Sequence, residues 1–155
     1  MSLEYRIEKD RIAVVVTTMG GDRLSGDIFV QPYTRHRMGR EEAPDVLNGE
    51  EPFFPLVTEG HETFLIAKDN VREVEIPGPV DEELQIAVGA QAIEIELWLT
   101  GGAIETGAVF LEVPMDHPRL LDFLNRLRDR FLTLYSLDGV RLVNRRLIER
   151  VRPLD

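Results

Sequence analysis

The residue types that most often carry out chemistry do not assemble into a familiar catalytic or metal-binding motif in this sequence. The chain has no cysteine, which excludes a disulfide, a thiolate nucleophile and a cysteine-ligated metal. The three histidines, His36, His61 and His117, lack the spacing of a helical metal-binding motif. No serine lies in a Gly-x-Ser-x-Gly elbow. We therefore predict no catalytic, cofactor-binding or metal-binding residues.

Two acidic positions recur in the chain, at Asp45 and Asp122, and a pair of carboxylates can perform acid–base catalysis. Each aspartate, however, lies near the start of its own predicted short helix, where a carboxylate caps free amides and favours the helix dipole. We interpret both as structural. Asn48 and Asn125 follow three residues later, and we interpret them as C-terminal caps because asparagine tolerates left-handed backbone.

Arginine is concentrated towards the C-terminal end of the chain. Nine arginines and four carboxylates lie between Arg119 and Arg152, whereas the whole chain has a formal net charge of −10. This segment could contact an anion or a nucleic acid, and solvated arginines are the alternative. The possible contact residues are Arg126, Arg130, Arg145 and Arg146. The basic loop at 35–40 is similarly either an anion site or a solvated loop.

The negative net charge disfavours partners that are themselves polyanions, which include nucleic acids and anionic membranes. The sequence contains no run of 18 apolar residues, so we predict no membrane-spanning segment. Its first residues also lack the apolar stretch of a signal peptide. We expect a cytoplasmic protein without a cofactor.

The sequence contains an internal repeat. Residues 18–30 align with 99–111 at an offset of 81, and residues 45–48 align with 122–125 at an offset of 77. Residues 65–74 align with 142–151, again at an offset of 77. Three blocks in the same order predict a tandem duplication. We expect a first unit over 1–76, a Pro/Gly linker with a possible extra strand over 77–90, and a second unit over 91–155.

Each unit is predicted to contain five short strands, with one short helix between the second and third strands. The segment 12–18 is rich in β-branched residues, and 92–99 alternates in polarity. Gly26 interrupts the second strand, which indicates a bulge or bend that lets the sheet curl into a barrel. The fold is therefore expected to be mainly β, a tandem pair of small barrels, with an open α+β meander as the alternative. Trp98 is expected to be half-buried between the units.

Three segments of the second unit form a set, namely Leu-Leu-Asp-Phe-Leu-Asn at 120–125, Phe-Leu-Thr-Leu at 131–134 and Val-Asn-Arg-Arg-Leu-Ile at 143–148. With these segments and five predicted strands per unit, nearly the whole chain outside the linker resembles the Sm-like branch of the SH3-type small barrels, and specifically a group of uncharacterised bacterial Sm-like proteins. The first unit matches at 45–48 and 54–56, but Ala67-Lys68 replaces the Asn-Arg pair. The resemblance implies a five-stranded barrel and no catalytic residue.

Sm proteins assemble into rings through exposed edge strands, and some bind RNA. The Asp/Asn and Arg-Gly signatures of RNA-binding members are not evident here. The sequence therefore predicts a non-enzymatic interaction or scaffold module that associates with itself or with another protein through barrel edges. Three chains would then resemble a ring of six barrels. The alternatives are RNA binding through the arginine-rich surface of the second unit, and a ligand or enzyme site between the units.

Overall fold

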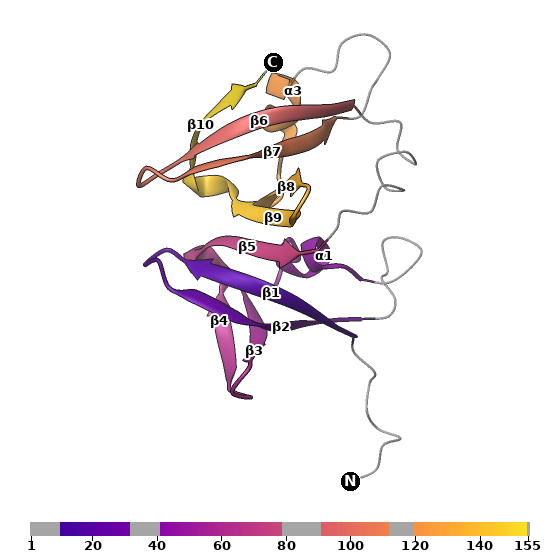
Figure 1. Ribbon diagram of the computed structural model, residues 1–155, viewed down its shortest axis with the longest axis vertical. Coiled ribbons are helices and arrows are strands. Elements are labelled where there is room, and N and C mark those ends of the chain that lie inside the picture. The colour runs from indigo at the N-terminus through magenta and orange to yellow at the C-terminus, as the bar shows by residue number, and fades with distance from the viewer. Residues whose placement is uncertain (1–9, 32–40, 79–90, 112–119, 155) are drawn as a thin grey trace.

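The computed structural model describes residues 10–31, 41–78, 91–111 and 120–154 (Figure 1). The first half, residues 10–78, contains β1 (Asp10–Thr18), β2 (Arg23–Val30), α1 (Ala43–Leu47), β3 (Phe53–Thr58), β4 (Thr63–Ala67), the 3₁₀ turn η2 (Lys68–Asn70) and β5 (Val71–Pro77). The second half, residues 91–154, contains β6 (Gln91–Leu99), β7 (Ile104–Leu111), α3 (Leu120–Arg126), β8 (Phe131–Ser136), β9 (Gly139–Asn144), the 3₁₀ turn η3 (Arg145–Leu147) and β10 (Ile148–Pro153).

The described residues confirm the prediction of a mainly β fold with short helices. Strands form where β-branched residues are dense or polarity alternates, and the order of elements is the same in the two halves. The possible extra strand at 84–88 lies outside the described residues, as do His36, His117 and the basic loop at 35–40. In the described part of the chain, no helix is long and apolar enough to cross a membrane.

The described strands form one antiparallel sheet of ten strands, in the order β10-β6-β7-β8-β9-β5-β1-β2-β3-β4. Each half contributes five neighbouring strands, and β5 of the first half pairs with β9 of the second. Among the described strands, β4 does not pair with β5, and β9 does not pair with β10. Neither half is therefore closed into a barrel by hydrogen bonds between strands. The sheet is thus open and continuous, whereas the sequence analysis expected two separate barrels.

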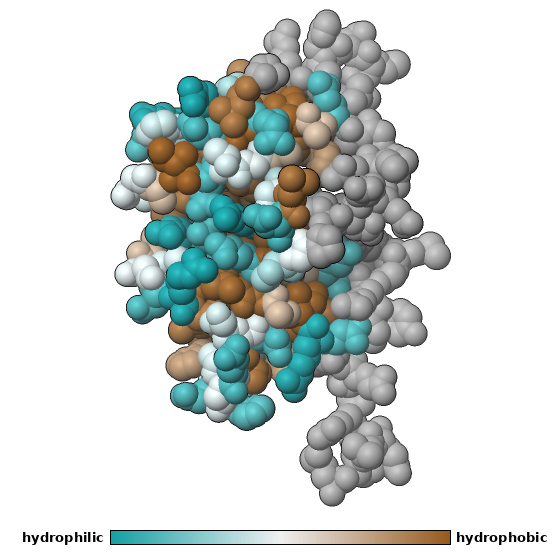
Figure 2. All heavy atoms as spheres, in the orientation of Figure 1, coloured by the Kyte–Doolittle hydropathy of each residue, from teal (hydrophilic) through white to brown (hydrophobic). Residues whose placement is uncertain are grey.

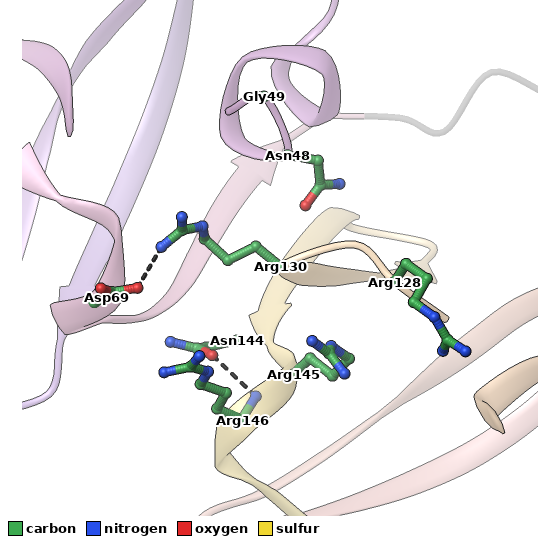
Figure 3. Close-up of a pocket in the computed structure, with 8 residues that line it drawn as sticks. All are labelled: Asn48, Gly49, Asp69, Arg128, Arg130, Asn144, Arg145 and Arg146. Atoms are coloured by element: carbon green, nitrogen blue, oxygen red, sulfur yellow. Dashed lines mark hydrogen bonds and ion pairs between the residues drawn. The ribbon is translucent and has the colours of Figure 1, made fainter. Parts of the chain in front are cut away.

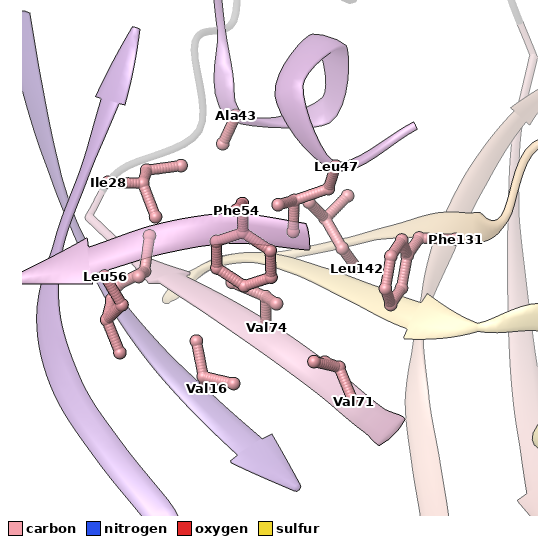
Figure 4. Packing of buried hydrophobic residues seen from close by; sticks show 11 residues of the cluster. Val16, Ile28, Ala43, Leu47, Phe54, Leu56, Val71, Val74, Phe131 and Leu142 are labelled. Atoms are coloured by element: carbon pink, nitrogen blue, oxygen red, sulfur yellow. The ribbon is translucent and has the colours of Figure 1, made fainter. Parts of the chain in front are cut away.

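The hydrophobic core is divided into two clusters, and the first of them takes residues from both halves. Val16, Phe54 and Val74 of the first half pack there with Phe131 and Leu142 of the second half (Figure 4). All five side chains are buried. The second cluster, which includes Ile95, Leu111 and Leu134, draws only on the second half. The first half therefore completes its core with side chains from the second.

Trp98 lies elsewhere than the sequence analysis expected. It is half-buried in β6, as predicted, but its neighbours across the sheet are Ile104 of β7 and Arg150 of β10. The Arg150 guanidinium lies 4.2 Å from the centre of the indole ring, and the indole N–H donates to Glu96. Trp98 therefore belongs to the outer part of the second half, because β6 is separated from β5 by β7, β8 and β9.

Candidate functional site

The most distinctive feature of the molecule is the seam, which we define as the β5–β9 ladder and the side-chain contacts across it. Five residue pairs form the ladder, from Glu73 opposite Val143 to Pro77 opposite Gly139. Figure 1 shows the two strands side by side between the halves. A row of backbone hydrogen bonds backed by a shared apolar core makes the seam a structural joint rather than a loose contact.

Two asparagines add side-chain hydrogen bonds across the seam. The Asn144 amide nitrogen donates to the carbonyl of Val71 at 2.8 Å, and the backbone N–H of Phe131 donates to Asn48 Oδ1 at 2.8 Å. Asn48 does end α1, as predicted, but its φ of −91° is not left-handed. Its side chain is used for joining the halves, a role that a local cap assignment could not reveal.

A charged cluster lies beside the ladder. Arg141 of β9 is bound to Glu105 at 2.5 Å, and its Nε lies 3.9 Å from Glu75, its partner in the ladder. On the face shown in Figure 2, hydrophilic residues gather at the level of the seam, with hydrophobic residues above and below. Glu73 is buried, and this burial raises the pKa of its carboxyl to about 7, with the charge and hydrogen bond of Glu105 adding to the effect.

A polar pocket of about 350 Å³ opens where the two halves meet. We call it the arginine pocket, and it is lined by Asn48, Gly49, Asp69, Arg128, Arg130, Asn144, Arg145 and Arg146 (Figure 3). Three of the four predicted contact arginines, Arg130, Arg145 and Arg146, line it. Arg126 is exposed on α3 and is not among the lining residues. Sequence analysis missed Arg128, although that residue belongs to the same run of arginines.

The arginines of the pocket differ in how far their guanidinium groups are already engaged. Arg130 forms an ion pair with Asp69 across the seam, whereas Arg145 Nε donates to the carbonyl of Asp129 at 3.0 Å. Arg128 donates to the carbonyls of Asn125 in α3 and of Leu127 just after it. For the guanidinium of Arg146, the described residues provide no hydrogen bond or ion pair. Only its backbone N–H is bonded, to Asn144 Oδ1.

Lys68 lies behind the pocket and is almost completely buried. Its ammonium donates to the carbonyls of Val46 and Gly49, at 2.8 and 3.2 Å, and so holds the end of α1. Burial lowers the pKa of Lys68, and the positive charge of Arg130 lowers it further. The pocket is therefore a region of concentrated positive charge in a chain whose overall charge is negative.

The sheet also ends in two strands that have only one described neighbour each, β4 and β10. Strand β4 (Thr-Phe-Leu-Ile-Ala) contains no charged residue, and its Leu65 is 71% exposed. Next to it, Phe53 of β3 is 56% exposed. A bare apolar edge is unusual because natural edge strands commonly carry a charge or a proline that prevents pairing.

The remaining candidates have local roles. Asp45 accepts a hydrogen bond from the backbone N–H of Glu42 at 2.8 Å as part of a capping box, which confirms the structural interpretation. His61 lies in a turn with a φ of 61°. Among the described residues, no three or more His, Asp or Glu side chains are grouped so that they could hold a metal ion.

Comparisons of the chain with models of protein families, with curated proteins and with solved structures give no match.

Proposed function

We propose that this chain is a non-enzymatic, self-associating interaction module made of two copies of one small barrel-like unit. In this proposal the β4 edge of one chain pairs with the β10 edge of the next, in the way that β9 pairs with β5 inside the chain. The association is head to tail, so it produces a ring if the rotation closes.

The equivalence of the two halves rests on the sequence repeat and on the shared order of elements. By the offset of 77, β4 corresponds to β9 and β5 corresponds to β10. The seam therefore joins the fourth strand of one unit to the fifth strand of the other. The strands left at the two ends of the sheet are the remaining fourth strand, β4, and the remaining fifth strand, β10. They are the two unpaired sides of a second seam.

The observation that carries the proposal is the exposure of residues whose counterparts are buried in the seam. Leu142 of β9 is fully buried against the first half, and its counterpart Leu65 is 71% exposed. Phe131, the first residue of β8, is also fully buried there, and Phe53, the first residue of β3, is 56% exposed. A partner chain at β4 would bury both, and this would contribute on the order of 2–4 kcal/mol.

The β10 side shows the complementary pattern. Val74 of β5 is fully buried in the seam, whereas its counterpart Val151 is only half-buried. One stabilising contact would be missing between chains, because Ala67 stands where Asn144 provides its buried hydrogen bond. The contact between chains would therefore be weaker than the internal seam and would depend on concentration.

The test is sedimentation equilibrium of the wild-type chain and of two variants at micromolar concentrations. Leu65→Glu places a charge on the β4 edge, and Leu137→Glu is the control because Leu137 is 97% exposed in the turn between β8 and β9. We expect wild type and Leu137→Glu to form the same oligomer, and Leu65→Glu to weaken association at least tenfold, which corresponds to about 1.4 kcal/mol. A monomeric wild type, or an unchanged Leu65→Glu oligomer, would refute the proposal.

A further inference from the structure

We propose that the arginine pocket between the two halves binds the phosphate group of a small phosphate-bearing molecule. This inference does not depend on self-association, because the pocket is built entirely within one chain. The number of arginines in the sequence indicated a basic region, but it could not indicate the position of this pocket.

The arginine pocket concentrates positive charge. Four arginines line it against a single carboxylate, Asp69, in a chain of net charge −10. Lys68 lies directly behind this lining, where it holds Gly49. Such a concentration of like charge is unfavourable without a counter-ion, and a phosphate with two negative charges would offset part of it.

Suitable hydrogen-bond donors line the pocket, and some of them have no partner among the described residues. The guanidinium of Arg146 has no bonding partner among the described residues, and a planar guanidinium matches two phosphate oxygens. Asn48 accepts from Phe131 through its oxygen, and within the described part of the chain its amide N–H groups remain free to donate. Among the described residues, the Arg130 side chain pairs with Asp69 alone, and the Asp69 side chain is 69% exposed, so Arg130 could bind a phosphate at little cost. In the view of Figure 3, the guanidinium groups of Arg130 and Arg146 both lie on the side of Asp69.

The size of the pocket limits the size of its ligand. A cavity of about 350 Å³ suits a small molecule, and a nucleic acid would need positive charge along a longer track. The other paired arginines of the second half do not extend the pocket. Arg141 is bound to Glu105, Arg150 lies 3.2 Å from Glu149, and Arg152 lies 3.1 Å from Glu96. Carboxylates thus neutralise the arginines that could have formed such a track.

The test is calorimetric titration at low ionic strength with four probes, namely inorganic phosphate, pyrophosphate, adenosine 5′-monophosphate and a ten-nucleotide single-stranded RNA. The variants are Arg146→Gln, which removes the unengaged guanidinium, and Arg126→Gln, which removes an exposed arginine outside the pocket. Because the Arg146 side chain makes no bond in the described structure, Arg146→Gln should fold normally, and circular dichroism and the thermal midpoint would check this.

We expect one molecule of a phosphate-bearing probe to bind to each chain. Its affinity should be about tenfold weaker for Arg146→Gln and unchanged for Arg126→Gln. Tighter binding of the nucleotide than of free phosphate would identify a phosphate ester as the ligand, and the reverse order would identify free phosphate. No binding at millimolar phosphate or pyrophosphate would overturn the inference, as would equal binding by Arg146→Gln. The inference would also be refuted if the RNA bound most tightly and if both variants weakened RNA binding equally, because that result would indicate a diffuse basic surface.

Discussion

Gly26 and Gly107 show how a single residue type controls the close approach of neighbouring strands in this sheet. A Cβ at Gly26 would lie 2.5 Å from the carbonyl oxygen of Val57, and one at Gly107 would lie 2.8 Å from that of Tyr135. Of the bulge or bend predicted at Gly26, the bulge is absent, because the β1–β2 register is regular there. The glycine instead lets β3 pass close to β2, because only hydrogen occupies the space between their backbones.

Replacing Gly26 with alanine should therefore destabilise the protein, because a backbone oxygen cannot move away as a flexible side chain could. We expect Gly26→Ala to lower the free energy of unfolding by about 1–3 kcal/mol. Gly60→Ala is the matched control, since the nearest atom to its new Cβ would be a Glu62 side-chain oxygen at 3.8 Å. Urea denaturation of both variants provides the measurement. Equal stability of the two variants would contradict this account of Gly26.

At the scale of elements, the positions of the strands could be predicted because their signals are local. The β-branched run of β1, the alternation of β6 and the glycine-marked hairpins each depend on residues close in sequence. The pairing of β5 with β9 could not be predicted in this way. A residue pattern determines which face of a strand is buried, but it does not determine which strand lies at its edge.

The same distinction between local signals and tertiary arrangement explains why the arginine pocket could be predicted only in part. Arg130, Arg145 and Arg146 come together because the start of β8 and η3 both reach the seam, whereas Arg126 lies at the end of α3 and stays apart. Asn48 and Asp69 contribute from the first half, far from these arginines in the sequence. Only the tertiary arrangement of the halves brings them to the arginines, so composition could indicate a basic region but not a pocket.

The seam also gives the protein a specific dependence on pH, through the buried Glu73 of β5. The pKa of Glu73 is about 7 in the folded state and 4.5 in the unfolded chain. Between these two pH values, the folded state keeps the proton that the unfolded chain has lost. The free energy of unfolding should therefore decrease as the pH rises from about 4.5 to about 7, by up to roughly 3 kcal/mol, and this contribution should then stay level.

Glu73→Gln should remove this pH dependence, because glutamine resembles the protonated carboxyl and cannot ionise. We expect the variant to be more stable than the wild type at about pH 8 and to match it more closely at about pH 5. Urea midpoints measured across this range would test the expectation, with Glu94→Gln as the control because Glu94 is exposed on β6. If wild type and Glu73→Gln changed in parallel with pH, the carboxyl would not be the responsible group.

At the scale of the whole molecule, the order of the ten strands connects the seam to the free ends. One continuous sheet runs from β10 at one end to β4 at the other, and these two edges of a single chain lie far apart (Figure 1). Any contact between them must join different chains. In the proposed assembly, the two free edges of each chain would form with neighbouring chains the joint that β5 and β9 form inside the chain.

The register of the internal seam predicts the register between chains. Val74 lies opposite Leu142 in the seam, so the corresponding residues Val151 and Leu65 should lie opposite each other between chains. The chain contains no cysteine, which means that engineered cysteines can pair only with each other. A disulfide between these two positions would have to link neighbouring chains, because β4 and β10 lie at opposite ends of the sheet.

The most direct test of self-association through these edges is oxidation of the double variant Leu65→Cys/Val151→Cys, followed by denaturing gel electrophoresis and mass spectrometry. We predict covalent multimers in which peptide mapping identifies a disulfide between positions 65 and 151 of different chains. The variant Leu137→Cys/Val151→Cys, with its cysteine in the exposed turn after β8, should stay predominantly monomeric. A Leu65→Cys/Val151→Cys protein that remained monomeric, or that cross-linked no better than the control, would contradict self-association through β4 and β10.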